Sequence, residues 1–550
     1  MSPRLAGLGV SPGTASGPVA RMGDAPALPP AAPLVADTDQ ETSRARGALA
    51  EVAGWYQRRA AALSGPAADV LTAESLMAAD PALATAVEKL VLSGRAAPWA
   101  VTEALAAYKD VLLAAGGYLA ERASDLDDIA RRAVAVLLGV AMPGLPDPGH
   151  PFVLVAEDLA PADTATLDPR QVLAIVTARG GPTSHTAILS KTLGIPAVVS
   201  CQGIDAVADG AVVGVDGSAG TVVVEPSAEE VRDLRVRAAE RAARRASSRG
   251  PGRTRDGHPV KLLVNVGGPA DVGAVIDADA EGVGLFRTEF LYLERADAPS
   301  VEEQRGIYAS VFAPLAGRKV VVRTLDAGAD KPLAFAAHDV EPNPALGVRG
   351  LRLARRQPGL LADQLRALQL AAGDTGADVW VMAPMVSTPT EAADFAATVH
   401  GHGLPIAGAM VEVPAAALRA GSILTRVDFV SIGTNDLSQY TFAADRQIGQ
   451  LAELLDPWQP ALLELIALTA RAGRDLGKSV SVCGEAASDP ALAVVLTGLG
   501  VTSLSMAAGS VADVRAALAE RTLADCEAAA SAALAAAGPD EARRAVSAVS

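Results

Sequence analysis

The chain is organised around one short stretch, VLAIVTARGGPTSHTAIL at residues 172–189. The apolar run Val172 to Val176 is typical of a β-strand, and the second apolar run opens a helix that we expect to end before Gly194. His185 therefore lies on a glycine-rich turn between strand and helix. Such a turn exposes the imidazole and directs helix N-terminal N–H groups at any anion the ring acquires, which suits a phosphorylated histidine. The alternative interpretation is a histidine that only forms a hydrogen bond within a loop.

Composition and charge limit the partners of the chain. Its 550 residues predict about two to four domains. The formal charge of −16 and a pI near 4.9 argue against nucleic acid or an anionic membrane as a bulk partner. Only 3% of the residues are aromatic, which disfavours a surface that stacks bases. The three cysteines, Cys201, Cys483 and Cys526, form no close pair, so we expect reduced thiols and a cytoplasmic protein.

We expect neither a signal peptide nor a membrane span. The N-terminus lacks a charged start followed by an apolar core. The uncharged stretch from Pro490 to Ala512 is long enough to cross a bilayer, but Gly498-Leu499-Gly500 interrupts it. This pattern predicts a helix, a turn and a buried strand instead.

The first half of the chain predicts an α/β domain with a helical insertion. Residues 4–20 are expected to form a short strand with turns around residues 11–17, as the first strand of the domain. Helical spacing from about 37 to 140 predicts about four helices. Strand-like runs then resume at 152–156, 172–176, 197–199 and in a hairpin over 211–224. We therefore predict an α/β domain at residues 1–20 and 150–226, with a helical subdomain at 35–142. The insertion is either purely structural or a docking platform for a protein partner.

The second half predicts a (β/α)8 barrel at residues 257–550. A charged run followed by Ser, Gly and Pro predicts a linker helix and hinge at 227–256. After the linker, eight apolar runs alternate with helix-like segments, at about 260–266, 282–287, 319–325, 378–385, 405–412, 428–434, 478–483 and 502–507. Eight such repeats are typical of this fold, whose chemistry gathers at the C-terminal ends of the strands.

Chemically useful side chains recur at those strand ends. They are the arginines Arg287, Arg323 and Arg446, with Lys331 shortly after the third run, the carboxylates Glu412 and Asp436, and Cys483. Arginines from separate strand ends suit phosphate oxygens, and two carboxylates suit a hard ion such as Mg²⁺. A lone cysteine can act as an acid or base on carbon. Taken singly, each arginine is better explained as a surface ion-pair partner and each acid as a helix cap. Their recurrence at the strand ends is what favours a shared site.

Three motifs resemble one protein family over nearly the whole chain. They are Gly180-Gly181-Pro182-Thr183-Ser184-His185, Gly284-Leu285-Phe286-Arg287-Thr288-Glu289-Phe290-Leu291-Tyr292 and the segment from Ser431 to Tyr440. The family is enzyme I of the bacterial phosphoenolpyruvate:sugar phosphotransferase system.

The resemblance implies an enzyme that moves a phosphoryl group from phosphoenolpyruvate, through a phosphohistidine, to the histidine-containing phosphocarrier protein and releases pyruvate. It implies these roles: His185 is phosphorylated, Arg287, Arg323, Arg446 and Lys331 bind the substrate, Asn435 contacts its phosphate, Glu412 and Asp436 ligate Mg²⁺, and Cys483 protonates the enolate. It further implies that the inserted helices bind the carrier and that the barrel forms a homodimer. Residues 71–82 depart from the family pattern, because Glu74 and its neighbours include no histidine.

Two other functions compete with this interpretation. Pyruvate phosphate dikinase and phosphoenolpyruvate synthase share the histidine domain and the barrel, but they need a large ATP-binding domain. The chain offers neither the space nor a glycine-rich phosphate loop for one. The other alternative is a non-catalytic paralogue that only binds and regulates.

Overall fold

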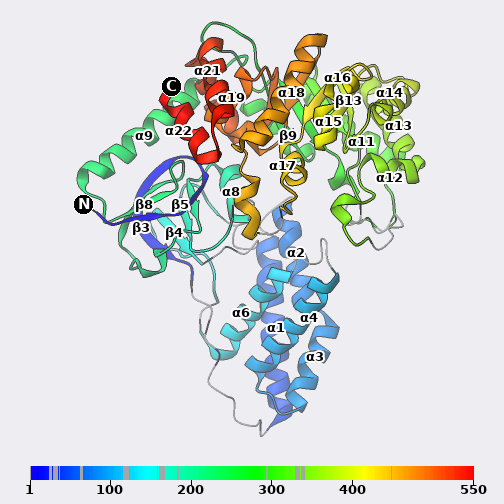
Figure 1. Cartoon of the computed structure of the whole chain (residues 1–550). Coiled ribbons are helices and arrows are strands. Elements are labelled where there is room, and N and C mark those ends of the chain that lie inside the picture. Colours follow the sequence, from blue (N-terminus) through cyan, green and yellow to red (C-terminus); the bar gives the residue numbers. More distant parts are fainter. Residues whose placement is uncertain are drawn as a thin grey trace. The chain divides into compact units, whose positions relative to one another are not determined.

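The structure is a computed structural model of the chain (Figure 1), divided into two compact units, Met1–Ala239 and Glu240–Ser550. It describes residues 2–23, 26, 28, 35, 37–61, 66–115, 123–140, 142–157, 159, 167–181, 185–292, 295, 297–328, 333, 335, 341–446 and 449–549.

The first unit contains a mixed eight-stranded sheet. Its strands are β1 (Arg4–Ala6), β2 (Leu8–Ser11), β3 (Thr14–Arg21), β4 (Phe152–Ala156), β5 (Val172–Thr177), β6 (Ala197–Val199), β7 (Val212–Asp216) and β8 (Thr221–Val224), in the order β1-β8-β7-β3-β4-β5-β6-β2. Strands β3 to β6 run parallel, and β7 and β8 form the predicted hairpin. The prediction of one strand over residues 4–20 is wrong, because turns at Gly7 and Pro12-Gly13 divide this segment into three strands.

Strand β5 leads into the turn predicted around His185. Both faces of the strand are buried, as is usual for parallel strands. Ile175 belongs to the apolar cluster on one face, and Ala174 and Val176 belong to the cluster on the other. Helix α8 (His185–Leu193) begins at His185 itself. The backbone of His185 therefore lies at a helix N-terminus, as the sequence predicts; its side chain and residues 182–184 lie outside the described part of the chain.

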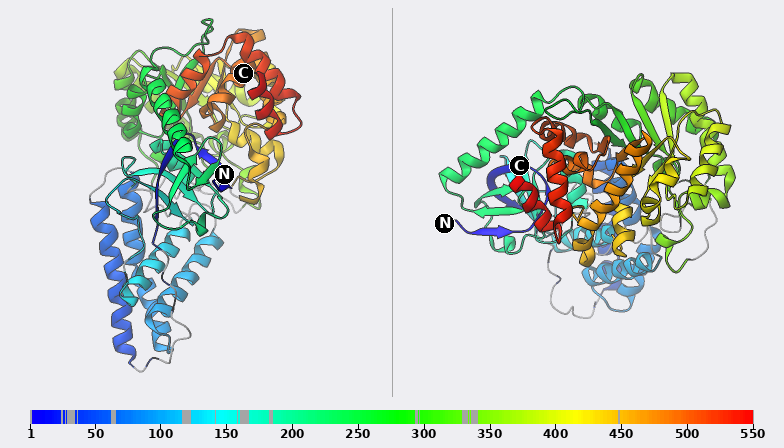
Figure 2. Two further views of the ribbon diagram at one scale, coloured as in Figure 1. Left: turned by 90° about the vertical axis from the view of Figure 1, so that its left-hand side faces the viewer. Right: turned by 45° about the horizontal axis from the view of Figure 1, so that its top comes forward.

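The inserted segment forms a helical bundle, seen side-on in Figures 1 and 2. Its described helices are α1 (Thr38–Ala60), α2 (Pro66–Ala78), α3 (Pro81–Leu92), α4 (Ala97–Ala115) and α6 (Ala123–Leu138). The sequence predicted about four helices, and the described part of this segment contains five. Asp37 and Asp80 cap the starts of α1 and α3 by accepting backbone N–H bonds, which fixes where these helices begin.

A charged group is buried inside this bundle. The Arg132 side chain is fully buried, and its Nε donates to Asp128 Oδ2 at 2.7 Å, one helical turn away. Tyr56 donates its hydroxyl to the same carboxylate oxygen at 2.7 Å, and the guanidinium lies 4.1 Å from the centroid of the Trp55 ring. The Asp128 carboxylate therefore balances a cation that has no access to water.

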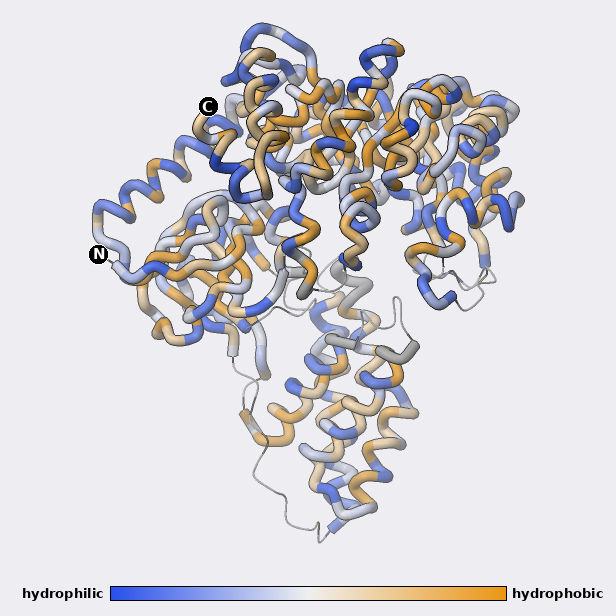
Figure 3. Tube along the Cα trace, viewed as in Figure 1, coloured by the Kyte–Doolittle hydropathy of each residue, from blue (hydrophilic) through white to orange (hydrophobic). Residues whose placement is uncertain are grey.

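Helix α9 (Ala228–Ser247) contains the boundary between the two compact units. Figure 3 shows it as hydrophilic along most of its length. In the first unit, Leu234 is buried over Gly214, where a Cβ atom would come within 2.4 Å of the leucine. Arg237 also pairs with Asp216 there, at 2.6 Å. This part of the predicted linker helix is thus fixed to the sheet by packing and by charge.

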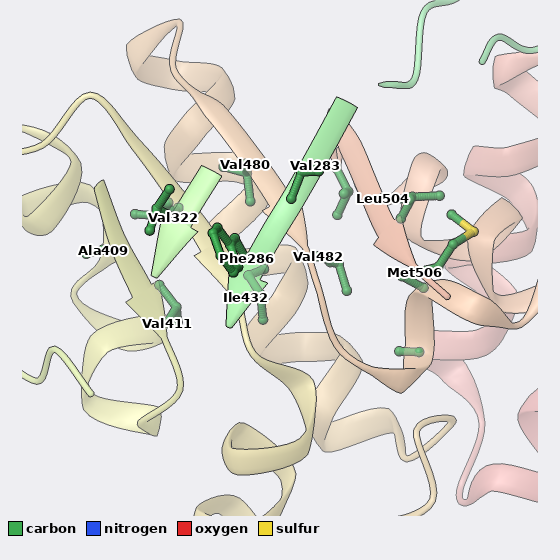
Figure 4. Packing of buried hydrophobic residues seen from close by; sticks show 14 of the residues in the cluster. Val283, Phe286, Val322, Ala409, Val411, Ile432, Val480, Val482, Leu504 and Met506 are labelled. Atoms are coloured by element: carbon green, nitrogen blue, oxygen red, sulfur yellow. The ribbon is translucent and has the colours of Figure 1, made fainter. Parts of the chain in front are cut away.

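The second unit is a closed parallel barrel, which confirms the predicted fold. The strands are β9 (Lys261–Val266), β10 (Gly282–Arg287), β11 (Lys319–Arg323), β12 (Asp378–Ala383), β13 (Ala407–Val411), β14 (Phe429–Ile432), β15 (Ser479–Val482) and β16 (Ser503–Met506). The helices are α10 (Val272–Asp277), α11 (Val301–Phe312), α12 (Leu351–Arg356), α13 (Pro358–Thr375), α14 (Pro389–Gly401), α15 (Pro414–Leu418), α16 (Ala420–Leu424), α17 (Thr434–Phe442), α18 (Pro460–Leu476), α19 (Pro490–Gly498), α20 (Val511–Ala519), α21 (Leu523–Ala535) and α22 (Pro539–Val549). Outward-facing strand residues such as Val322, Ile432 and Leu504 form the apolar layer of Figure 4.

The uncharged stretch from Pro490 to Ala512 adopts the predicted pattern of a helix, a turn and a buried strand. It forms α19, a turn and the buried strand β16. Among the described residues, none of the helices combines the length and the apolar character that a bilayer crossing requires.

The interior of the barrel has two unlike halves. Inward-facing residues of β10 to β13 are apolar, namely Leu285, Val321, Met382, Met410 and, partly buried, Trp380. The inward positions of β14 to β16 carry one apolar residue, Phe429 at the start of β14, and otherwise serines, namely Ser431, Ser479, Ser481, Ser503 and Ser505. At the N-terminal mouth, Lys319 Nζ lies 3.5 Å from the centroid of the Trp380 ring. Burial, helped by the nearby charge of Lys261, lowers the pKa of Lys319 to about 8.

Replacing Asp128 with Ala should remove the buried carboxylate that accepts from both Arg132 Nε and the Tyr56 hydroxyl, which costs about 3 to 5 kcal/mol. We expect amide hydrogen exchange in α1 and α6, followed by mass spectrometry, to accelerate by about a hundredfold or more. The matched control is Asp127→Ala. This neighbouring carboxylate is half exposed and pairs with Lys109 on the surface, so its loss should cost at most about 1 kcal/mol. Equal effects from the two substitutions would contradict the assignment.

Candidate functional site

Arg323, the last residue of β11, is the central cation at the C-terminal mouth of the barrel. Its side chain is 7% exposed and contacts the carboxylates of Glu289, Asp326 at 3.2 Å and Glu412 at 3.7 Å. Burial is the largest influence on the pKa of Arg323 and lowers it, but the surrounding carboxylates together outweigh it and raise the pKa above its ordinary value. Arg323 therefore remains a cation in a site closed to water.

A second buried guanidinium, Arg349, lies beside it. Arg349 is 1% exposed, and its two terminal nitrogens contact Asp326 at 3.1 Å and Asp436 at 3.3 Å. Its backbone pairs with that of Gly328, where a Cβ atom would come within 2.5 Å of the arginine side chain. The glycine thus permits the close approach that directs Arg349 into the site, and Asp326 contacts both arginines.

Glu412 follows β13 and is almost fully buried. Its Oε2 accepts a hydrogen bond from the Met385 N–H at 2.8 Å. Met385 reaches this position with a left-handed φ of 56°, a conformation that costs an apolar residue about 1 to 3 kcal/mol. Burial, and then the negative charges of Asp436 and Asp326, raise the pKa of Glu412 to about 7. The carboxylate therefore lies where added positive charge would favour its ionised form.

Asp436 lies in the first turn of α17, where the helix dipole favours a negative charge. Its second oxygen lies 3.7 Å from Arg446 Nη1, and the Arg446 backbone N–H donates to Gln439 Oε1 at 3.1 Å. Asn435, the preceding residue of α17, is half-buried at the same helix start. The start of one short helix thus supplies two of the predicted site residues and contacts a third.

Cys483 follows β15 and is buried beneath these charges. Its sulfur lies 3.5 Å from the Ile432 carbonyl oxygen, and its own carbonyl accepts a hydrogen bond from Asn265 Nδ2 at 3.1 Å. Burial is the main cause that raises the pKa of the thiol to about 11, and the charge of Glu412 adds to it. Cys483 is therefore a protonated thiol at neutral pH.

The structure brings together most of the residues that the sequence predicted for the site. Arg323, Glu412, Asp436 and Arg446 are joined by the contacts above, and Cys483 is electrostatically coupled to Glu412, Arg323 and Arg287. Arg287 ends β10 with its side chain exposed. Lys331 and the His185 side chain lie outside the described part of the chain, so their predicted roles remain predictions.

Three models of phosphoenolpyruvate-utilising enzymes match the chain in succession. The N-terminal model matches residues 6–122, the mobile-domain model 148–220 and the PEP-binding-domain model 241–523. The phosphoenolpyruvate-protein phosphotransferase of Streptomyces coelicolor is 54% identical to the chain, over 100% of this chain and 99% of its own length. The chain belongs to the enzyme I family of phosphoenolpyruvate-protein phosphotransferases.

Other enzyme I relatives are more distant. The phosphoenolpyruvate-protein phosphotransferase of Haloferax volcanii is 42% identical, over 81% of this chain and 80% of its own. That of Bacillus subtilis is 36% identical, over 93% of each chain. A solution structure of an Enzyme I (nEIt) protein aligns over 43% of this chain and 98% of its own, with 31% identity and a TM-score of 0.37. The resemblance drawn from the three motifs is therefore confirmed, and the enzyme is a phosphotransferase.

Sequence reasoning gave no role to Arg349, Asp326 or Glu289, although all three contribute to the site of this enzyme I. Glu289 lies in the motif over residues 284–292 and Asp326 directly follows the apolar run 319–325, but nothing in the sequence shows that they contact Arg323. Arg349 lies in the long segment that follows β11. A signal existed there, because Gly347-Val348-Arg349-Gly350 places an arginine between glycines on the functional face of a barrel.

The three buried thiols should react slowly with iodoacetamide. Burial raises the pKa of Cys201, Cys483 and Cys526 to about 11 each, so the thiolate that reacts is scarce at pH 8. Labelling of each cysteine, followed by mass spectrometry, should rise about tenfold per pH unit without a plateau below pH 10. The denatured chain is the control and should level off above pH 9. A plateau near pH 9 in the folded enzyme would disprove the raised values.

Proposed function

We propose that the enzyme transfers the phosphoryl group of phosphoenolpyruvate to its own His185 and then to a histidine-containing phosphocarrier protein, releasing pyruvate. This reaction is the first step of a sugar phosphotransferase system. The observation that carries the proposal is the pair of buried guanidinium groups, Arg323 and Arg349, at the C-terminal mouth of the barrel beside Glu412, Asp436 and Cys483. Together these side chains offer anion binding, a cation site and a proton donor.

We propose that Arg287, Arg323 and Arg446 bind the phosphate and carboxylate of the substrate, with Asn435 and Lys331. One unused hydrogen-bond donor supports this role in particular. Arg323 Nε is buried and forms no hydrogen bond within the part of the chain that the structure describes, so a donor remains for a substrate oxygen. Charge-assisted bonds from a guanidinium suit planar carboxylate and phosphate groups.

The charge balance of the site favours a divalent cation together with the substrate. Four arginines, Arg287, Arg323, Arg349 and Arg446, face four carboxylates, Glu289, Asp326, Glu412 and Asp436. These charges cancel, so binding of a multiply anionic substrate would leave the site with a net negative charge. We propose that Glu412 and Asp436 hold Mg²⁺.

No three His, Cys, Asp or Glu side chains among the described residues form a metal cluster, so water and substrate oxygens would complete the six ligands of the ion. When bound, Mg²⁺ neutralises charge on the phosphoryl oxygens.

His185 acts as the nucleophile in this proposal. One ring nitrogen attacks phosphorus, the N–P bond forms as the ester P–O bond breaks, and the enolate of pyruvate departs. Cys483 then gives its thiol proton to the terminal carbon of the enolate, which yields pyruvate and a thiolate. The arginines hold the substrate in line and stabilise the charge that develops on it.

We propose that the helical bundle binds the carrier and that the barrel forms the homodimer of a cytoplasmic enzyme. Membership of the enzyme I family supports the carrier contact. Glu74, in the segment that departs from the family pattern, is buried, so it supports the bundle and does not face the carrier.

The direct test is incubation with Mg²⁺ and ³²P-labelled phosphoenolpyruvate in the absence of ATP. We expect an acid-labile, base-stable label that moves to an added carrier, and none when Ala replaces His185. His150→Ala is the matched control, because His150 lies exposed in a loop, and it should label normally. Label that forms on the His185→Ala variant would reject the assignment, and no label on the native enzyme would favour a protein that only binds.

Replacing Glu412 with Gln should raise the Mg²⁺ concentration needed for half-maximal labelling by about tenfold or more, because the change removes a charged ligand. Chelation of Mg²⁺ by EDTA should abolish labelling. Glu391→Gln is a suitable control. Glu391 is also buried, but its carboxylate caps α14 by accepting from the Ser387 and Thr388 N–H groups. An unchanged Mg²⁺ requirement in Glu412→Gln would remove this residue from the metal site.

A further inference from the structure

Three serines lie side by side on adjacent strands inside the barrel. Ser431 of β14 is opposite Ser481 of β15, which is opposite Ser503 of β16. Each is at most 5% exposed. Their hydroxyl oxygens are buried and form no hydrogen bond with any residue that the structure describes. A buried hydroxyl without a partner is uncommon in native proteins, so this serine row (Ser431, Ser481 and Ser503) needs partners that the protein chain does not supply.

The serine row connects the buried thiol with the far mouth of the barrel. Cys483 lies two residues beyond Ser481, so its side chain faces the same interior. The Ser431 hydroxyl is close enough to the sulfur to lower the pKa of the thiol, although their hydrogen-bond geometry is poor. At the other end, Ser503 is opposite Lys261 of β9, whose side chain is exposed. The row thus passes from the site to solvent.

Water fits the spacing of the row. Adjacent strands lie about 4.8 Å apart, and the three hydroxyls form no hydrogen bond with one another, so one water molecule between neighbouring serines would supply the missing partners. The facing part of the interior, from Leu285 to Met410, is apolar, and Phe429 of β14 belongs to the same cluster, so water would be confined to the space beside the serine row.

The proposed role of Cys483 creates a need for such a path. Resting on that role, the thiol loses one proton to the enolate in each turnover, yet it is only 2% exposed and cannot regain one from bulk water directly. We infer that Ser431, Ser481 and Ser503, bridged by buried water, relay protons between solvent at the N-terminal mouth of the barrel and Cys483. Each hydroxyl passes its proton toward the thiolate and accepts another from the water behind it, so every O–H bond is restored and one solvent proton is consumed.

The test compares two exchange rates at equilibrium in D₂O, with the full chain, Mg²⁺, phosphoenolpyruvate and pyruvate. NMR follows ¹³C passing between pyruvate and phosphoenolpyruvate, which reports phosphoryl transfer. It also follows deuterium entering the pyruvate methyl group, which requires the Cys483 proton to exchange with solvent. The ratio of deuterium entry to carbon exchange measures the relay alone.

Ser481→Val and Ser481→Thr form a matched pair, because the two side chains have the same shape and only Thr keeps the hydroxyl. We expect the ratio to fall by about tenfold or more in Ser481→Val, with carbon exchange retained, and to remain near the native value in Ser481→Thr. Ser503→Val and Ser503→Thr repeat the comparison at the solvent end of the row, in case one position does not tolerate a larger side chain.

The outcomes separate the relay from the function on which it rests. Equal ratios in the Val and Thr variants at both positions would overturn the relay. Absence of carbon exchange in the native enzyme would instead overturn the proposed phosphoryl transfer. Unchanged deuterium entry in Cys483→Ala would remove the cysteine from the reaction and the relay with it.

Discussion

A guanidinium withdrawn from water must be balanced by negative charge, and Arg323 imposes this requirement on the whole C-terminal mouth of the barrel. Its partners arrive from separate parts of the chain: Glu289 after β10, Asp326 after β11 and Glu412 after β13. Asp326 then also binds Arg349, which reaches Asp436 on α17. The order of the site therefore depends on one alternating network of charges and not on any single loop.

Such a network costs stability, because every member has lost its hydration. The apolar layer between the strands and the outer helices offsets that cost, as the packing around Val322 and Ile432 shows. Inside the barrel, the half formed by β10 to β13 is equally apolar. The serines on the other side contribute less apolar burial. The proposed role of their hydroxyls in proton transfer would explain why serines occupy these positions.

The sequence predicted the barrel well because a local sequence pattern marks each strand. Runs such as 319–325 and 428–434 are apolar, bounded by turn residues, and lie where β11 and β14 are found. It predicted residues 4–20 less well, since closely spaced turns are hard to distinguish from one irregular strand. Arg349 was missed for another reason. Its position depends on a close backbone approach at Gly328, a contact between distant residues that no local pattern records.

The N-terminal mouth of the barrel has a consequence for optical experiments. Trp380 is one of two tryptophans in its compact unit, with Trp458, and Lys319 Nζ lies directly over its ring. The pKa of Lys319, lowered to about 8, means that this ammonium loses its charge as the solution passes from neutral to mildly alkaline. The electric field on the indole changes with it. The barrel thus carries an internal fluorescent indicator of proton binding, at the end opposite to the charge network.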